Sequence, residues 1–174
     1  MTSFFSETLG RHDRSAFRSG NDRIDTYFRE LVTQDVKRKY AAGYVLVERA
    51  SAKVAGFYTL SAHAIPLSEI ADDVARKLPR YPSVPAVLIG WLGRAIDFRG
   101  QGIGNLLLAD AIDRLVHSPV GAHAICADAI DEAAAASYRA HGFRPFVSRP
   151  QGLYLPVKTA AALFPLVRRG KALD

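Results

Sequence analysis

A glycine-rich segment in the middle of the chain constrains the fold more than any other feature. Residues 99–104 (RGQGIG) follow the apolar run Ala86–Leu92 and precede apolar residues at helical spacing, among them Leu107 and Ala111. This order predicts a buried strand, a tight turn and a helix. Glycines in such a turn permit positive φ angles and let an anion approach the backbone, and the first amides of the helix face that anion. The segment is therefore a candidate anion-binding loop.

The spacing of these glycines excludes two common phosphate-binding loops. A dinucleotide fingerprint needs glycines at the first, third and sixth places, but the sixth place counted from Gly100 is Asn105. A Walker loop needs Gly-Lys-Ser or Gly-Lys-Thr, which the segment lacks. The spacing that fits is Arg-x-x-Gly-x-Gly. A turn that only closes a strand onto a helix is the alternative interpretation at this point.

Hydrophobic periodicity and turn residues predict the other elements. After an irregular or short extended lead-in (1–20), we expect a helix (21–40), a strand pair (44–48 with 54–62), an amphipathic helix (67–78) and an extended proline-rich loop (79–85). The central strand and helix follow. After them we expect a strand (122–127), an alanine-rich helix (131–141) that ends at Gly142, a hairpin (145–148 with 153–157) and a closing helix (160–169). Gly90 and Gly93 in the central strand indicate a bulge or a close approach to the backbone, and a splayed strand there would expose unpaired amides.

Length and composition indicate one folded domain over residues 1–174. The chain has 174 residues, of which 49% are apolar and 23% charged. No apolar run approaches the roughly 18 residues of a membrane span, and the start lacks a secretion signal. We therefore expect a cytoplasmic protein that does not bind membrane. The single cysteine, Cys126, lies in an apolar run, which predicts burial and excludes an internal disulfide or a cysteine-built metal site; no metal is expected.

The charge balance favours an anionic partner. The formal net charge is +6, and coenzyme A, RNA or an acidic protein each satisfy it. Cations gather at the end of the first expected helix and near the prolines, where solvated surface is the ordinary explanation and nucleic-acid binding the functional one. These cations are Lys37, Arg38, Lys39, Arg76, Lys77 and Arg80.

The Arg-x-x-Gly-x-Gly spacing and the order of elements around it resemble the GNAT acyltransferases over most of the chain. The segments HDRSAFRSGNDRIDTYFRE, FYTLSA, VPAVLIGWLGR, RGQGIGNLLLADAI and DEAAAASYRAHGF resemble the GNAT toxins of bacterial toxin–antitoxin pairs in particular. The resemblance implies an α/β (α+β) GNAT fold with a mixed, mostly antiparallel central sheet flanked by helices. It also implies an acetyl-CoA-dependent N-acetyltransferase that acetylates aminoacyl-tRNA, a ribbon-helix-helix antitoxin as partner, and a homodimer.

The same resemblance implies roles for individual residues. Backbone amides of the glycine-rich segment would bind the pyrophosphate of acetyl-CoA, and the strand before it would bond the pantetheine arm and the acetyl carbonyl. The implied cofactor-binding residues are Leu92, Gly93, Arg94, Arg99, Gly100, Gln101, Gly102, Ile103 and Gly104. The cations that would then contact tRNA phosphates are Lys37, Arg38, Lys39 and Arg80. The chain departs from related toxins at Trp91, where arginine is frequent, and at Ala95, where aspartate is common.

Tyr138 corresponds to the general acid of the family. Acetyl transfer to an amine needs a neutral amine and a proton for the departing thiolate. A tyrosine, whose pKa is normally near 10, is protonated at neutral pH and can donate that proton. An α-amine titrates near 8, so a strong general base is unnecessary, and the sequence nominates none.

Two further functions fit the sequence. A GNAT enzyme with the same chemistry would instead acetylate a small amine or a protein N-terminus, with an acidic pocket for the cationic acceptor. A non-catalytic module would sense acetyl-CoA or dock a partner, and its function would survive the replacement of Tyr138 by phenylalanine.

Overall fold

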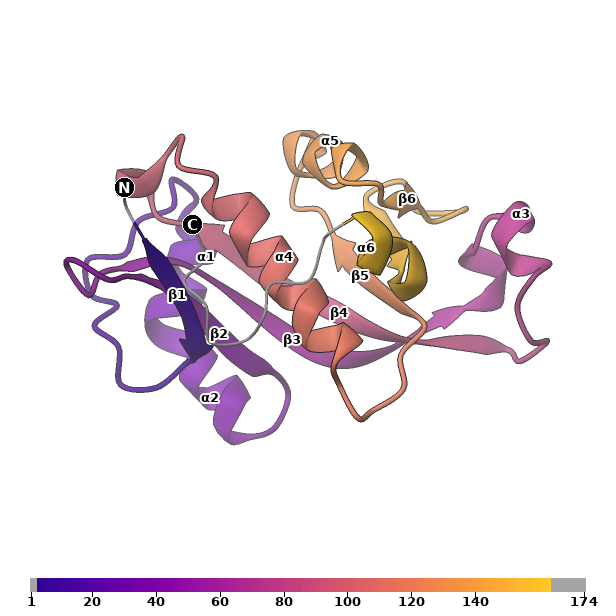
Figure 1. Cartoon of the computed structure of the whole chain (residues 1–174), viewed down its shortest axis with the longest axis horizontal. Coiled ribbons are helices and arrows are strands. Elements are labelled where there is room, and N and C mark those ends of the chain that lie inside the picture. The colour runs from indigo at the N-terminus through magenta and orange to yellow at the C-terminus, as the bar shows by residue number, and fades with distance from the viewer. Residues whose placement is uncertain (1–2, 164–174) are drawn as a thin grey trace. The chain divides into compact units, whose positions relative to one another are not determined.

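The computed structural model describes residues 3–163 of the chain and contains a seven-stranded sheet in the order β1-β2-β3-β4-β5-β7-β6 (Figure 1). Strand β4 pairs with β5 in parallel, and the pairs β1–β2, β2–β3, β5–β7 and β6–β7 are antiparallel. The strands are β1 (Phe4–Thr8), β2 (Ala42–Glu48), β3 (Val54–Pro66), β4 (Ser83–Arg94), β5 (Ala124–Asp128), β6 (Arg144–Pro145) and β7 (Gly152–Pro156). The mixed, mostly antiparallel sheet that the resemblance implied is confirmed.

Helices connect and flank these strands. The α-helices are α1 (Asp22–Thr26), α2 (Val32–Lys37), α3 (Asp72–Ala75), α4 (Ile103–Val116), α5 (Glu132–Ala140) and α6 (Val157–Leu163). A π-helical turn, η1 (Tyr27–Leu31), joins α1 to α2, and the 3-10 turns η2 (Leu67–Glu69) and η3 (Ile96–Phe98) follow β3 and β4. No helix among residues 3–163 is long and apolar enough to cross a membrane.

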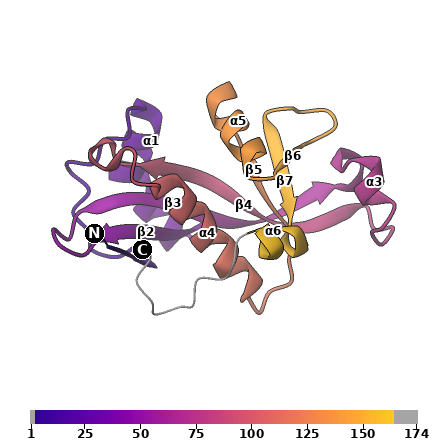
Figure 2. The ribbon, with the colours of Figure 1, turned by 45° about the horizontal axis from the view of Figure 1, so that its top comes forward.

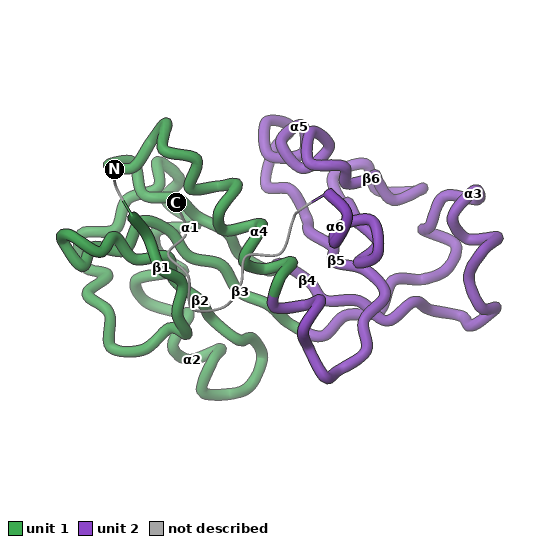
Figure 3. The backbone as a smooth tube through the Cα atoms, in the orientation of Figure 1, with its two compact units in different colours: residues 1–61, 90–113, 166–174 green, residues 62–89, 114–165 purple. Residues whose placement is uncertain are grey.

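The chain forms two compact units, each assembled from separate segments (Figure 3). Among the described residues, the first unit holds 3–61 and 90–113, and the second holds 62–89 and 114–163. The division falls within β3, β4 and α4, so each of these elements contributes to both units. One domain over residues 1–174 stays a prediction.

In the first unit, helices cover both faces of the sheet (Figure 2). A Cβ added at Gly56 would lie 2.8 Å from Leu107 Cδ1 and 3.1 Å from Ile103 Cγ2, so β3 and α4 pack closely on one face. The next residue, Phe57, points to the opposite face because side chains alternate along a strand. Its ring stacks on that of Phe28 in η1, with centroids 4.0 Å apart. The α1–η1 segment therefore covers the face opposite to α4.

The second unit has its own hydrophobic core. It contains buried residues from β3, β4, β5, β7 and the loops between them: Ile65, Ile70, Val84, Ala86, Ala124, Cys126, Phe146 and Tyr154. Burial raises the pKa of the Cys126 thiol to about 12, so the thiol is neutral at physiological pH. The predicted burial of this cysteine is confirmed.

Two sequence predictions in the second unit are wrong. Residues 67–78 do not form one amphipathic helix, because tertiary partners take the backbone groups that such a helix would use. The Glu69 carbonyl accepts a hydrogen bond from the Val147 amide, and the Ala71 amide donates a hydrogen bond to the Tyr154 hydroxyl at 3.1 Å. The proline-rich loop is also shorter than expected, since β4 begins at Ser83 and Val84 joins the core.

The remaining boundaries follow the predictions more closely. The strand pair and the central strand and helix lie where expected, and the first helix covers Asp22–Lys37 with a π-turn inside it. In the last hairpin, β6 contains only Arg144 and Pro145, because Val147 and the next residue, Ser148, bond to Glu69 instead. Helix α6 starts at Val157, and the part of the predicted closing helix beyond residue 163 lies outside the described residues.

Candidate functional site

The glycine-rich loop turns the chain from η3 into α4 with two residues of positive φ. Gly100 has φ +80° and Gly102 has φ +72°, a backbone region that disfavours side chains. Helix α4 is anchored by Ile103 and Leu107, which are fully buried. Burial of these side chains fixes the helix start against the sheet, and the loop conformation follows from the glycines.

The loop can accommodate an anionic group. A Cβ added at Gly100, Gly102 or Gly104 would meet no described atom within 4 Å, so open space lies over all three residues. The first amides of any helix have no acceptor within that helix, and here they belong to residues beside this open space. Arg99, Gly100, Gln101, Gly102 and Gly104 are exposed, whereas Ile103 is buried. The loop therefore fits a diphosphate group held by backbone amides at a helix start.

The end of β4 precedes this loop. The pairing of β4 with β5 runs from Ala86 to Ile89, and β4 continues to Arg94. A Cβ added at Gly93 would lie 2.6 Å from Ile24 Cγ2 and 2.8 Å from Phe57 Cε1. The predicted close approach to the backbone at Gly93 is therefore made by core side chains of the protein itself, Ile24 and Phe57. Leu92 and Arg94 are half-buried.

A partly buried polar relay, which no sequence pattern predicted, crosses from β4 to α2 through β3 and η1. The Trp91 amide donates to the Thr59 hydroxyl at 3.0 Å. Thr59 in turn hydrogen-bonds to the Tyr27 hydroxyl, which donates to the Asp35 carboxylate at 2.9 Å. Between Gly90 and Gly93, the Trp91 amide is therefore satisfied by a threonine side chain, and the expected unpaired amides of a splayed strand stay a prediction. Only Trp91 carried a sequence signal, as a departure from related toxins.

This relay also holds two aromatic rings together. The rings of Trp91 and Tyr27 stack with centroids 4.2 Å apart and an interplanar angle of 8°. Tyr27 is 4% exposed, and its burial, followed by the Asp35 carboxylate, raises the pKa of its hydroxyl far above the usual value. The hydroxyl therefore remains a hydrogen-bond donor at every physiological pH.

Replacing Thr59 by valine should destabilise the protein by about 1–3 kcal/mol, because the shape is kept while a buried amide loses its acceptor. Thr59 is 1% exposed, so water cannot replace the hydroxyl. Urea unfolding of the wild type, Thr59→Val and the control Thr59→Ser measures the effect. Serine keeps the hydroxyl and should retain most of the stability. If the wild type and the Thr59→Val variant have equal free energies of unfolding, the relay contributes nothing to stability.

Tyr138 lies in the second unit, on α5. The helix is capped by Asp131, whose carboxylate accepts a hydrogen bond from the Ala134 amide at 2.8 Å. It ends at Ala140, and Gly142 shortly after it has φ +91°. Phe143 then packs on the Tyr138 ring, with centroids 5.1 Å apart. Both predicted helix ends are confirmed. Burial raises the pKa of Tyr138 to about 12, which keeps the hydroxyl protonated.

The predicted basic residues are exposed and belong to both units. Lys37, Arg38 and Lys39 lie at the end of α2 in the first unit, where Lys39 adopts a positive φ of 62°. Arg80 lies in the second unit, between α3 and β4. The predicted cofactor-binding residues share the first unit with the α2 cations, whereas Tyr138 is in the second unit with Arg80.

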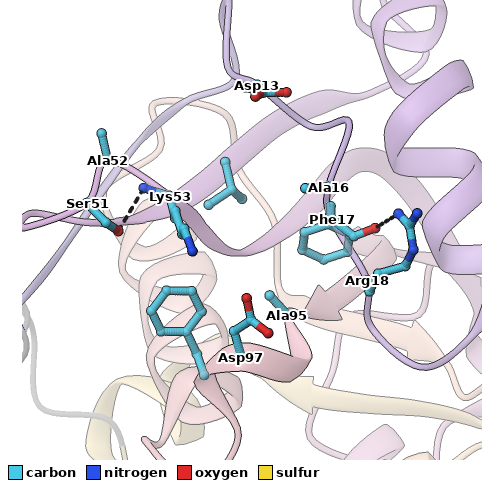
Figure 4. A pocket seen from close by; sticks show the side chains of 11 residues that line it. Asp13, Ala16, Phe17, Arg18, Ser51, Ala52, Lys53, Ala95 and Asp97 are labelled. Carbon is cyan, nitrogen blue, oxygen red and sulfur yellow. Dashed lines mark hydrogen bonds between the residues drawn. The ribbon is translucent and has the colours of Figure 1, made fainter.

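A pocket of about 320 Å³ lies beside η3 in the first unit (Figure 4). Its charged lining consists of Asp13, Arg18, Lys53 and Asp97. Two carboxylates offset two cations, so the lining lacks the excess positive charge that a diphosphate requires. The glycine-rich loop is therefore the better anion site. Residues 3–163 contain no group of three or more side chains suited to hold a metal ion.

The sequence is similar to those of bacterial toxins. An alignment with the Probable toxin TacT of Sinorhizobium fredii (strain NBRC 101917 / NGR234) is 31% identical over 162 residues and covers 88% of this chain and 90% of that protein. The tRNA-acetylating toxin of Mycobacterium tuberculosis (strain ATCC 25618 / H37Rv) is 29% identical over 153 residues, which cover 87% of this chain and 90% of the toxin. No protein-family profile matches the sequence.

The structure is similar to solved toxin structures. AtaT complexed with acetyl-methionyl-tRNAfMet has a TM-score of 0.84 and 25% identity, with 92% of this chain and 99% of that chain covered. AtaTR bound with AcCoA has a TM-score of 0.77 and 25% identity, with 93% and 98% covered. Both the fold and the sequence therefore relate this chain to the same group of proteins.

Proposed function

We infer that this chain, which belongs to the GNAT toxins of bacterial toxin–antitoxin systems, is an acetyl-CoA-dependent N-acetyltransferase that modifies the α-amine of aminoacyl-tRNA and so blocks translation. The single observation that carries this function is the similarity, over 87% of this chain, to a tRNA-acetylating toxin. Within the structure, the glycine-rich loop at the start of α4 supports the cofactor assignment. Acetyl-CoA supplies the acetyl group as a thioester.

We assign the binding of acetyl-CoA to the first unit. The amides of Gly100, Gly102, Ile103 and Gly104 would hold the diphosphate, with Arg99 adding positive charge. The Gln101 amide donates to the Phe98 carbonyl at 3.3 Å, so Gln101 would contribute through its exposed side chain. The backbone of Leu92, Gly93 and Arg94 would orient the pantetheine arm. Support comes from the open space over the loop glycines and from the burial of Ile103, which holds the helix start in place.

We assign the proton transfer to Tyr138. In the reaction, a bond forms between the amine nitrogen and the acetyl carbon, the carbon–sulfur bond breaks, and the thiolate takes up a proton from Tyr138. The nitrogen loses one proton to solvent as the amide forms, and the tyrosine regains its proton from solvent. A hydroxyl whose pKa is raised to about 12 is protonated at every physiological pH and is available as that donor. The nucleophile needs no strong base, because a substantial fraction of an α-amine is neutral near pH 8.

Binding of tRNA should depend steeply on salt and on the cations at the end of α2. We expect the combined replacement of Lys37, Arg38 and Lys39 by alanine to reduce the slope of log affinity against log salt concentration by about 1 for each phosphate that the variant no longer neutralises. Fluorescence anisotropy of labelled tRNA across a salt series measures this slope. The control Lys37→Arg/Lys39→Arg keeps the charge and should keep the slope. If the alanine variant has the same slope as the wild type, tRNA binds at another surface of the protein.

The partners and the location follow from the family. A ribbon-helix-helix antitoxin is the protein partner, as the toxin–antitoxin complex AtaTR among the similar structures supports. We propose that the protein acts in the cytoplasm, where charged tRNA is found, and that it forms a homodimer.

Transfer of labelled acetyl from acetyl-CoA to a mixture of charged tRNAs tests the function. Uncharged tRNA, small amines and short peptides are the parallel acceptors. Label on the aminoacyl group supports the proposal. Label on small amines or peptides alone would favour the other acetyltransferase hypothesis, and cofactor binding without any transfer would favour a non-catalytic module.

A further inference from the structure

Trp91 is an aromatic ring held in one position and only partly covered. Its amide is bonded to Thr59, and one face of its indole is covered by the Tyr27 ring. Tyr27 and Thr59 are 4% and 1% exposed, whereas Trp91 is only half-buried. The relay fixes the rings at both ends, since the Tyr27 hydroxyl is held by Thr59 and by Asp35. The accessible part of the indole is therefore a preorganised surface.

The position of Trp91 on the sheet relates this surface to the proposed reaction. The glycine-rich loop opens α4, which packs on the Gly56 face of the sheet. Trp91 stacks on Tyr27 of η1, which belongs to the segment that covers the opposite face. The coenzyme is thus assigned to one face, and the other face is left for the acceptor. Along the strand, Trp91 precedes Leu92 by one residue, which is about 3.3 Å.

From this arrangement, we propose that Trp91 is a specificity-determining residue that contacts the side chain of the aminoacyl group and favours apolar side chains over acidic ones and over glycine, which has no side chain. The proposal rests on the proposed function, because it needs the acetyl group to lie beside Leu92–Arg94. The part of a charged tRNA that must reach this point is the aminoacyl group. The terminal base is separated from the amine by the ribose and the ester, and so lies farther away.

The chemistry of the surface sets the preference. An indole face is apolar and polarisable, so it stabilises aliphatic, thioether and aromatic groups by contact and stacking. The relay contains one carboxylate, Asp35, which accepts a hydrogen bond from the Tyr27 hydroxyl, and it contains no cation. A glutamyl or aspartyl side chain would therefore lose hydration against the indole without gaining an ionic partner from this cluster.

Trp91 is the only tryptophan of the chain, so intrinsic fluorescence reports on it directly. We would titrate the wild type, in the presence of CoA, with 3′-amino-3′-deoxyadenosine that carries an amide-linked methionyl, phenylalanyl, glycyl or glutamyl residue. The methionyl and phenylalanyl probes should change the emission, and the glycyl and glutamyl probes should change it much less. If the nucleoside without an aminoacyl group changes the emission equally, Trp91 stacks on the base. If no probe changes the emission, Trp91 contacts neither the aminoacyl group nor the base. Either result would overturn the proposal.

Variants give the second measurement. In Trp91→Ala, the kcat/KM ratio of methionyl-tRNA to glycyl-tRNA should fall about tenfold, and Trp91→Phe should restore most of it. A merely structural role would lower activity on all charged tRNAs equally and leave the ratio unchanged, which would refute the proposal. If the alanine variant does not fold, the same kcat/KM ratio is measured for Trp91→Leu, and the fluorescence titration of the wild type still tests the proposal. If the wild type acetylates no charged tRNA, the proposed function itself fails, whatever the fluorescence shows.

Discussion

Tyr138→Phe should lower kcat by about 10²-fold or more while it leaves the affinity for acetyl-CoA nearly unchanged. The variant keeps the ring that packs on Phe143 and removes only the hydroxyl, so binding survives and the proton donor is lost. Single-turnover transfer of labelled acetyl to charged tRNA gives the rate, and calorimetric titration gives the affinity. A rate within about threefold of the wild type would show that another group protonates the thiolate.

Tyr154→Phe is the matched control in the same unit. Tyr154 is 1% exposed, and its hydroxyl accepts the Ala71 amide. The loss of this hydroxyl should therefore reduce stability through an unpaired buried amide and should leave the rate of transfer unchanged. Slow transfer by this variant as well would assign the effect of Tyr138→Phe to the packing of the second unit.

The pH dependence of the wild type adds an independent check on Tyr138. Burial raises the pKa of Tyr138 to about 12, and the protonated form is the donor, so the tyrosine should limit the rate only as the pH approaches that value. At lower pH, protonation of the acceptor amine removes the nucleophile. We expect kcat/KM to rise as the amine loses its proton and then to stay level up to about pH 10. A fall in the rate between pH 8 and 10 would contradict this assignment.

The combined replacement of Gly100 and Gly102 by alanine should weaken acetyl-CoA binding by roughly 100-fold. A side chain in the left-handed region costs about 1–2 kcal/mol per residue, and each 1.4 kcal/mol is a factor of ten. Both glycines have positive φ values and open space above them, so the variant loop escapes the strain by changing conformation and its amides no longer converge. Isothermal titration with acetyl-CoA measures the change.

Gly20→Ala separates this effect from general destabilisation. Gly20 also has a positive φ of 93°, and a Cβ there would lie 3.7 Å from Ile96 Cδ1, an ordinary contact. The control should lose stability through the same strain and should bind acetyl-CoA as tightly as the wild type. Unchanged affinity in the double variant, or equal losses in both proteins, would remove the coenzyme from the loop.

Features that depend on neighbours in the sequence were predicted from the sequence. The cap at Asp131, the end at Gly142 and the turn at Gly100 and Gly102 each need one residue type with a particular backbone preference. The predicted helix over residues 67–78 failed for the opposite reason. Its periodic pattern was present, but Tyr154 and Val147, far along the chain, bond to the backbone groups of that segment.

The sequence by itself therefore determined the strand-turn-helix around Arg99–Gly104, the elements beside it and the family to which they belong. Only the tertiary structure revealed that Trp91, Thr59, Tyr27 and Asp35 form one relay. The physical reason is the range of the interactions. A turn or cap is stabilised by hydrogen bonds and φ preferences within a few residues, whereas the relay joins β4, β3, η1 and α2, and only the folded packing of the sheet against α1–η1 brings its members together.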